Sequence, residues 1–210
     1  MQAWLLKPWA KPLVFMLCLL PCAWLLYAAF TDGLGANPAE ALLRSTGDWT
    51  LRFLCIVLAV TPLRQISGWN LLVRYRRMLG LYVFFYACLH LLCYAWFDMG
   101  LDWGEIARDI PKRPFILVGF AALTLLALLA ASSPRMVVRR LGGRRWQLLH
   151  RLVYAVAPLA LLHFFWMRAG KNNFAEVAVY AAILGALLGW RVLRALRSNQ
   201  PATARSGGRT

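Results

Sequence analysis

Charged residues are scarce in this sequence, and acidic residues are the scarcest. Charged side chains make up 15% of the 210 residues, only eight residues are Asp or Glu, and hydrophobic residues account for 61%. Soluble globular domains carry about 25% charged residues, so the composition excludes an ordinary soluble domain and indicates a polytopic membrane protein. The net charge of +16 does not predict a nucleic-acid partner, because the basic residues fall in short clusters between long apolar runs.

Several other features are missing. The chain has no G-x-G-x-x-G opening a βαβ unit, no G-x-x-x-x-G-K-[ST] and no convincing internal repeat. It leaves no loop longer than about 20 residues, so there is no room for a folded cofactor domain outside the membrane. The five cysteines all lie in apolar runs without a C-x-x-C pair, which predicts buried thiols and neither disulfides nor a metal cluster.

What the chain does have is apolar runs of transmembrane length. A hydrocarbon core of about 30 Å needs about 20 helical residues, and six runs meet this requirement. We place them at 12–30, 49–66, 76–97, 114–132, 146–167 and 174–193. The expected fold is therefore an all-α membrane bundle of six helices over residues 1–197, followed by a disordered cytoplasmic tail over 198–210. The first run could be a cleaved signal peptide, but its length, its aromatic residues and Pro21 favour a retained helix.

The charges predict an orientation for these helices. All eight acidic residues fall on one side of the predicted spans, whereas the segments on the other side carry Lys and Arg without any acid. Because Lys and Arg collect in cytoplasmic loops, both termini should be cytoplasmic. Arg52 and Arg151 fall within spans, where they would either snorkel to the interface or neutralise an acidic cofactor group.

The three histidines are the candidate ligands. His90, His150 and His163 all fall within predicted spans, where ionisable groups are costly and suggest a function. Packing against a neighbouring helix is the alternative for any one of them, but it explains three less well. The predicted directions put His90 and His163 in the outer half of the membrane, where they can share one centre, and His150 about 20 Å away near the inner surface.

Haem is the cofactor that these positions favour. Two imidazoles facing each other across an apolar bundle are typical haem-iron ligands. Zinc would need more ligands, and copper, the other alternative, lacks a convincing Met or Cys set. Arg77 precedes His90 by thirteen residues, the same spacing that separates His150 from His163. A second haem would then be held by His150 with Arg77 or Arg76 near it, either as a propionate partner or as the opposing ligand, unless these arginines are positive-inside anchors.

One geometric difficulty concerns His150 and His163. Thirteen residues of ideal helix leave the two side chains about 140° apart around the axis. We expect a kink or local unwinding at Pro158 to bring both rings toward the interior.

Four segments resemble a known family. They are TGDWTLRFLCIVLAVTPLR (46–64), RRMLGLYVFFYACLHLLCYAWFD (76–98), KRPFILVGFAAL (112–123) and GRRWQLLHRLVYAVAPLALLHFFW (143–166). They are similar to MsrQ (YedZ), the haem-binding membrane subunits of the MsrPQ methionine sulfoxide reductase system, in the wider ferric-reductase-like transmembrane group. The family's haem-ligand histidines fall on His90, His150 and His163.

The resemblance implies a b-type cytochrome of the bacterial inner membrane with one or two haems, and it attributes an FMN for which we find no residues. Electrons would come from the quinone pool or a cytoplasmic flavin reductase and pass to MsrP, a periplasmic molybdenum-containing partner that holds the catalytic site. The acidic segment from Asp98 to Asp109 is the expected docking surface. The alternatives are a stand-alone ferric reductase and a non-redox transporter or scaffold.

Overall fold

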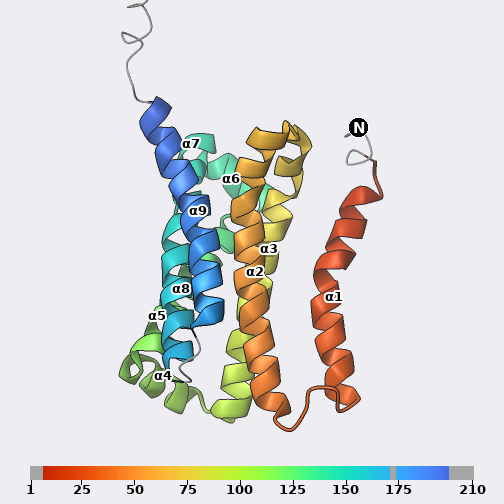
Figure 1. Cartoon of the computed structure of the whole chain (residues 1–210), viewed down its shortest axis with the longest axis vertical. Coiled ribbons are helices and arrows are strands. Elements are labelled where there is room, and N and C mark those ends of the chain that lie inside the picture. Colours follow the sequence, from red (N-terminus) through yellow and green to blue (C-terminus); the bar gives the residue numbers. More distant parts are fainter. Residues whose placement is uncertain (1–6, 171–173, 199–210) are drawn as a thin grey trace, which may run out of the picture.

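Apolar chain segments in lipid must satisfy their own backbone hydrogen bonds, so helices are expected. The computed structural model, which describes residues 7–170 and 174–198, consists of helices joined by short connections (Figure 1). In chain order the helices are α1 (Ala10–Phe30), α2 (Pro38–Ser67), η2 (Asn70–Leu72), α3 (Val73–Cys93), η3 (Tyr94–Asp98), α4 (Trp103–Lys112), α5 (Pro114–Ala131), α6 (Arg135–Leu141), α7 (Gly143–His150), α8 (Val153–Ala169) and α9 (Ala175–Ser198).

The prediction of an all-helical six-span bundle is confirmed. Within the described ranges there is no strand, and six helical stretches are long and apolar enough to cross a membrane. The spans are Ala10–Phe30, Pro38–Ser67, Asn70–Asp98, Pro114–Ala131, Gly143–Ala169 and Ala175–Arg197. The first and last described helical ends lie at the same end of the bundle (Figure 1), as an even number of crossings requires.

The second span begins eleven residues earlier than predicted, at Pro38 instead of residue 49. The Asn37 side chain caps this helix by accepting a hydrogen bond from the backbone N–H of Glu40, and Pro38 occupies the first turn. These local signals extend the helix through a polar stretch that hydropathy excluded. The helix ends at Gly68, whose φ of 71° is left-handed and suits glycine.

Short helices fill connections for which the sequence analysis predicted no structure. Asp102 caps α4 by accepting from the backbone N–H of Glu105 at 2.9 Å, and α4 buries Ile106. At the opposite end, α6 carries several arginines, and α7, which follows Gly142, begins the fifth span Gly143–Ala169. Helices α4 and α6 thus lie at the two ends of the bundle (Figure 1).

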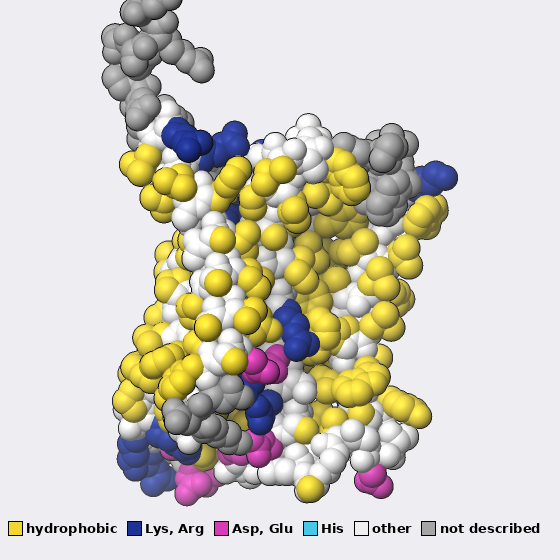
Figure 2. Space-filling view, viewed as in Figure 1, with side chains coloured by type: hydrophobic (Ala, Val, Ile, Leu, Met, Phe, Trp, Pro, Cys, Tyr) yellow, Lys and Arg dark blue, Asp and Glu magenta, His cyan; other side chains and the backbone are white. Residues whose placement is uncertain are grey.

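The two ends differ in charge. We call the end with Glu40, Asp98, Asp102, Glu105 and Asp109 the acidic end, and the end with the arginines of α6, α7 and the last turns of α9 the basic end. Figure 2 shows acidic side chains gathered at the lower end of one face, beneath a broad apolar band. The tail expected to be disordered begins at Ser198, which ends α9, and its remaining residues, 199–210, lie outside the described residues.

The first helix is held to the bundle by tyrosine hydroxyls from α3. The Tyr86 hydroxyl donates to the Cys18 carbonyl at 2.8 Å and accepts from the Cys22 N–H at 3.1 Å, so it inserts into the helix next to Pro21. Tyr82 donates to the Phe15 carbonyl at 2.9 Å. A side chain inserted into a helix ladder at a proline replaces the lost backbone bonds, and α1 otherwise exposes much of its apolar surface.

Candidate functional site

Two histidine rings meet in the half of the bundle nearer the acidic end. His90 comes from α3 and His163 from α8, and their ring centroids lie 6.0 Å apart with an interplanar angle of 81°. The two helices run in the same direction along the bundle, so residues at similar distances from their ends come to the same depth. The structure thus brings together the two histidines that the sequence analysis paired.

Each ring is fixed by a backbone carbonyl of another helix. His90 Nδ1 lies 2.9 Å from the Leu43 carbonyl oxygen on α2, and His163 Nδ1 lies 2.7 Å from the Phe115 carbonyl oxygen on α5. A carbonyl only accepts, so in both rings Nδ1 must carry the proton and donate. The neutral tautomer then leaves the Nε2 lone pair free in each ring, which is the arrangement found in metal-ligating histidines.

Two glycines make these contacts possible. A Cβ at Gly47 would lie 3.1 Å from the His90 ring, and a Cβ at Gly119 would lie 2.8 Å from His163 Nδ1. Each glycine follows its hydrogen-bonding carbonyl by four residues, Leu43 before Gly47 and Phe115 before Gly119. Helical side chains lean toward the N-terminus and cover the preceding turn, so glycine leaves that carbonyl open. The sequence analysis missed both glycines. Gly119 was detectable as a glycine inside the predicted apolar span 114–132, whereas Gly47 lies in a polar stretch before the predicted span 49–66.

The spacing of the rings fits a shared metal ion. A metal–nitrogen bond is about 2 Å long and an imidazole centre lies about 1 Å beyond its nitrogen, so two rings on one ion have centroids about 6 Å apart. The 6.0 Å separation of His90 and His163 agrees with this value. In residues 7–170 and 174–198 no group of three or more His, Cys, Asp or Glu side chains could hold a metal ion, and a two-ligand site suits haem iron.

His150 lies at the other end of the same span, against α5. Its ring is 4.1 Å from the Trp146 ring, centroid to centroid, and its Nε2 lies 3.2 Å from the Ser132 hydroxyl. Ser132 follows the last residue of α5, whereas Phe115 and Gly119 near the start of α5 contact His163. Both histidines of this span therefore face α5, thirteen residues apart.

The expected unwinding occurs at Arg151–Leu152, so the prediction of Pro158 was wrong in position. Pro158 lies inside α8, which continues through it. Instead, the N–H groups of Arg151, Leu152, Tyr154 and Ala155 bond to carbonyls three residues earlier. Such 3-10 bonding turns about 120° per residue instead of 100°, so four residues add about 80° and reduce the 140° offset to about 60°. Arg151 itself is exposed, not buried.

Arg77 lies near the residues that surround His150. It lines a cavity of about 380 Å³ at the basic end together with Ser133, Arg135, Val138, Arg139 and Trp146. The Trp146 and His150 ring centroids lie 4.1 Å apart, and Arg76 directly precedes Arg77 on α3. Trp146 thus lines this cavity with Arg77 and also contacts the His150 ring.

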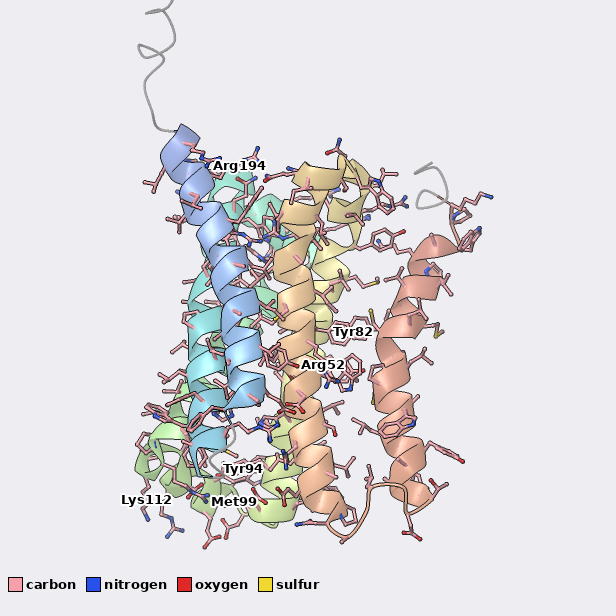
Figure 3. All side chains as sticks on the ribbon, in the orientation of Figure 1. Arg52, Tyr82, Tyr94, Met99, Lys112 and Arg194 are labelled. Carbon is pink, nitrogen blue, oxygen red and sulfur yellow. The ribbon has the colours of Figure 1, made fainter. Side chains whose placement is uncertain are left out.

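A charged groove between α2 and α9 was not anticipated. It encloses about 500 Å³ and is lined by Asp48, Trp49, Arg52, Cys55, Ile56, Glu176, Val179, Tyr180 and Ile183, a set that we call the α2–α9 groove. Arg52 lies over the Trp49 ring at 4.7 Å, and its Nε donates to the Tyr180 hydroxyl at 3.4 Å. Sequence placed Arg52 near the start of a span, but the longer α2 puts it near mid-helix (Figure 3).

Glu176 of this groove is held from inside the bundle. Its carboxylate forms an ion pair with Arg168, whose side chain is 7% exposed and also lies over the Phe164 ring. Arg168 follows His163 by five residues on α8, about 7.5 Å farther along the helix axis. The predicted fifth span, 146–167, ended one residue before Arg168.

Hydrogen bonds organise the acidic end. The Tyr94 hydroxyl donates to Asp109 at 2.5 Å, and Arg113 Nε donates to the same carboxylate at 2.7 Å. These two bonds hold the pKa of Asp109 below its usual range, and the carboxylate raises the pKa of Arg113. They fasten α4 to the π-helical end of the third span.

Comparisons with known proteins agree with this arrangement. Residues 46–161 match the family described as ferric reductase like transmembrane component. A protein of Polaromonas naphthalenivorans is 69% identical over 191 residues, covering 91% of this chain and 87% of its own length. A protein of Herminiimonas arsenicoxydans is 51% identical (94% and 90% covered), and one of Rhodospirillum rubrum is 51% identical (92% of each). All three are named protein-methionine-sulfoxide reductase heme-binding subunit MsrQ. No solved structure matches the chain.

Proposed function

The chain belongs to the MsrQ family of haem-binding subunits within the ferric-reductase-like transmembrane group, and from this membership we propose that it carries electrons across the membrane to a methionine sulfoxide reductase partner. It is a multi-pass membrane protein with six spans. Haem binding comes with the family. The proposal concerns the ligands, the route of the electrons and the partners.

We propose that His90 and His163 hold one haem between α3 and α8. The supporting observation is their 6.0 Å ring separation combined with Nδ1 atoms that both donate to carbonyls and so leave both Nε2 atoms available to the iron. Bound haem supplies one-electron redox chemistry. The chain's own part is to fix the tautomers, orient the rings and keep water away with apolar neighbours.

We propose His150 as the ligand of a second haem near the basic end. Arg77 or Arg76 would pair with its propionates, because an arginine fork binds carboxylates in two places. In support, a cavity lined by Arg77, Arg135 and Arg139 adjoins Trp146, which stacks on His150. The FMN implied by the family resemblance has no residue assigned to it.

The route runs from the basic to the acidic end. We propose that both termini are cytoplasmic, that the membrane is the bacterial inner membrane, and that the quinone pool or a cytoplasmic flavin reductase donates the electrons. An electron leaving the negative side gains about 2.3 kcal/mol per 100 mV on a full crossing. The acceptor is the periplasmic molybdenum-containing subunit MsrP, which holds the catalytic site and docks on the segment from Asp98 to Asp109.

The visible spectrum and the haem-to-protein ratio of purified variants test the ligand assignment. We expect His90→Ala and His163→Ala to lose the same haem signal, because each removes one side of a shared iron. We expect His150→Ala to lose a different signal and to leave the first intact. Full wild-type spectra in all three variants would show that the ligands are other residues.

Coupled assays separate the proposed role from a stand-alone ferric reductase. With reductant on the basic side, we expect methionine sulfoxide reduction only when the molybdenum subunit is present. Rapid reduction of an external ferric complex, unaffected by that subunit, would favour the ferric reductase. A colourless protein without a Soret band would contradict both functions.

A further inference from the structure

The α2–α9 groove has properties that membrane packing does not explain. Arg52 is exposed on α2 (Figure 3), and it lines the groove together with the apolar side chains of Ile56 and Val179. Within the described part of the chain no carboxylate lies within ion-pair distance of its guanidinium; its partners there are the Tyr180 hydroxyl and the Trp49 ring. A charged side chain at membrane depth is costly and is normally kept where it binds something.

The position of Arg52 within its helix favours an apolar partner over a phospholipid headgroup. Gly47 lies at the level of the His90 ring, and Arg52 follows it by five residues, about 7.5 Å farther from the acidic end. Figure 3 places Arg52 near the middle of α2. Phosphates lie outside the hydrocarbon core of about 30 Å, so a molecule that lies alongside Arg52 within that core is largely apolar.

The residues that line the groove indicate which other chemical features its ligand has. Its apolar walls are open to lipid, since Ile56, Val179 and Ile183 are 44%, 57% and 40% exposed. Its polar atoms are a guanidinium, a phenol and two carboxylates, those of Asp48 and Glu176. Trp49 offers a ring face. An apolar ring with hydroxyl or carbonyl oxygens would satisfy all of these groups, and a volume of about 500 Å³ is that of a small-molecule site.

We infer that the α2–α9 groove is the oxidation site for a lipid-soluble quinol. The inference rests on the proposed function and changes its route in one respect: electrons from this groove enter directly at the histidine pair, without a full crossing and without passing the His150 centre. Arg52 and Tyr180 bind the ring oxygens, and Trp49 contacts the ring. Asp48, which has no hydrogen bond or ion pair to another described side chain, accepts a proton. Glu176 is held in place by Arg168.

The reaction balances with the haem of the proposed function as oxidant. Both O–H bonds of the quinol break, two electrons pass singly to two ferric haem equivalents, and two protons go to carboxylates and then to the acidic end. The groove adjoins the histidine pair, because Asp48 directly follows Gly47, which touches the His90 ring. Arg168, the partner of Glu176, follows His163 by five residues.

Stopped-flow reduction of the haem by a short-chain ubiquinol tests the inference, with dithionite reduction measuring total haem. We expect Arg52→Leu to weaken the quinol dependence at least tenfold and Asp48→Asn to lower the maximal rate, both with unchanged haem content and midpoint potential. Binding of the oxidised short-chain quinone at equilibrium, measured without turnover, should weaken in Arg52→Leu by a similar factor.

Two matched controls accompany these variants. Arg44→Gln removes a guanidinium from the same helix, two turns away, where it pairs with Glu40 outside the groove, and should behave as wild type. Ile183→Trp should block the groove and slow quinol oxidation, whereas Val192→Trp on an exposed part of α9 should not.

The other outcomes overturn the inference. Unchanged quinol kinetics in Arg52→Leu and Ile183→Trp would place the donor site elsewhere. A lower haem content or a shifted potential, with quinol affinity intact, would make Arg52 a propionate partner. Absence of haem from the wild-type protein would instead refute the proposed function, and that result is read from the dithionite spectrum alone.

Discussion

His90 and His163 can each reach a backbone carbonyl because the neighbouring helix has a glycine, without a side chain, at the point of contact. Gly47 and Gly119 leave the Leu43 and Phe115 carbonyls uncovered, and the His90 and His163 rings fill the space where a Cβ would lie. Glycine in a helix interior costs about 1 kcal/mol relative to alanine. Here the cost is offset by two oriented imidazoles.

Gly119→Ala should therefore impair haem binding although alanine favours the helix. Its Cβ would lie 2.8 Å from His163 Nδ1, and a packed interior has no space into which the ring can shift freely. We expect the haem-to-protein ratio to fall roughly twofold or more, with a smaller loss for Gly47→Ala, whose contact is 3.1 Å. Gly185→Ala, with no atom within 4 Å of its Cβ, is the control and should keep its haem. Equal haem in all three variants would contradict the role of the glycines.

The helices of the acidic end depend on side-chain contacts that hydropathy does not report. Tyr94 at the end of the third span and Arg113 just before α5 both bond to Asp109 of α4. This carboxylate joins three elements that are adjacent in sequence but differ in direction. These bonds fix α4 at the acidic end of the bundle, which is the end nearer the histidine pair.

This contact predicts a pH-dependent stability. The pKa of Asp109 is lower in the folded protein than in the unfolded chain, so its stabilising contribution is present above about pH 4 and is lost as the pH falls through the folded pKa. We expect Asp109→Asn to lower the thermal midpoint in detergent by a few degrees at pH 7, with the difference from wild type shrinking below about pH 4. Glu105→Gln removes an exposed carboxylate from the same helix and should change little at either pH. A wild-type advantage that persists at low pH would refute this assignment.

At the scale of the whole bundle, the distribution of charged side chains agrees with the positions of the two ends of the chain. Both described helical ends lie at the basic end, and the acidic side chains gather at the other (Figure 2). If Lys and Arg mark the cytoplasmic side, then the histidine pair and the α2–α9 groove lie in the outer half, near the proposed acceptor.

Accessibility to a membrane-impermeant maleimide tests this orientation in spheroplasts. We expect Glu105→Cys to be labelled from outside several times more strongly than Arg139→Cys, because the two exposed positions lie at opposite ends. After lysis both should be labelled. The wild-type chain provides the background, since its five cysteines are buried or partly buried. The reverse labelling pattern would invert the proposed electron route.

Much of this protein could be predicted without a structure. Six spans, their order and the charge difference between the two ends follow from hydropathy and charge, which are properties of short segments and need no knowledge of distant contacts. His90, His150 and His163 stood out for the same reason, because an imidazole in an apolar run is conspicuous wherever the helices pack.

Contacts between helices could not be predicted from hydropathy and charge. Which carbonyl fixes each ring, why Gly47 and Gly119 matter and where Arg52 lies depend on how α2, α5 and α9 pack on α3 and α8. The turn that redirects His150 arises at Arg151–Leu152 from 3-10 bonding, not at Pro158, where proline chemistry pointed. Hydropathy is a sum over residues that are neighbours in the sequence. The histidine site instead forms where residues 43, 90, 115 and 163 come together, and only tertiary packing brings them together.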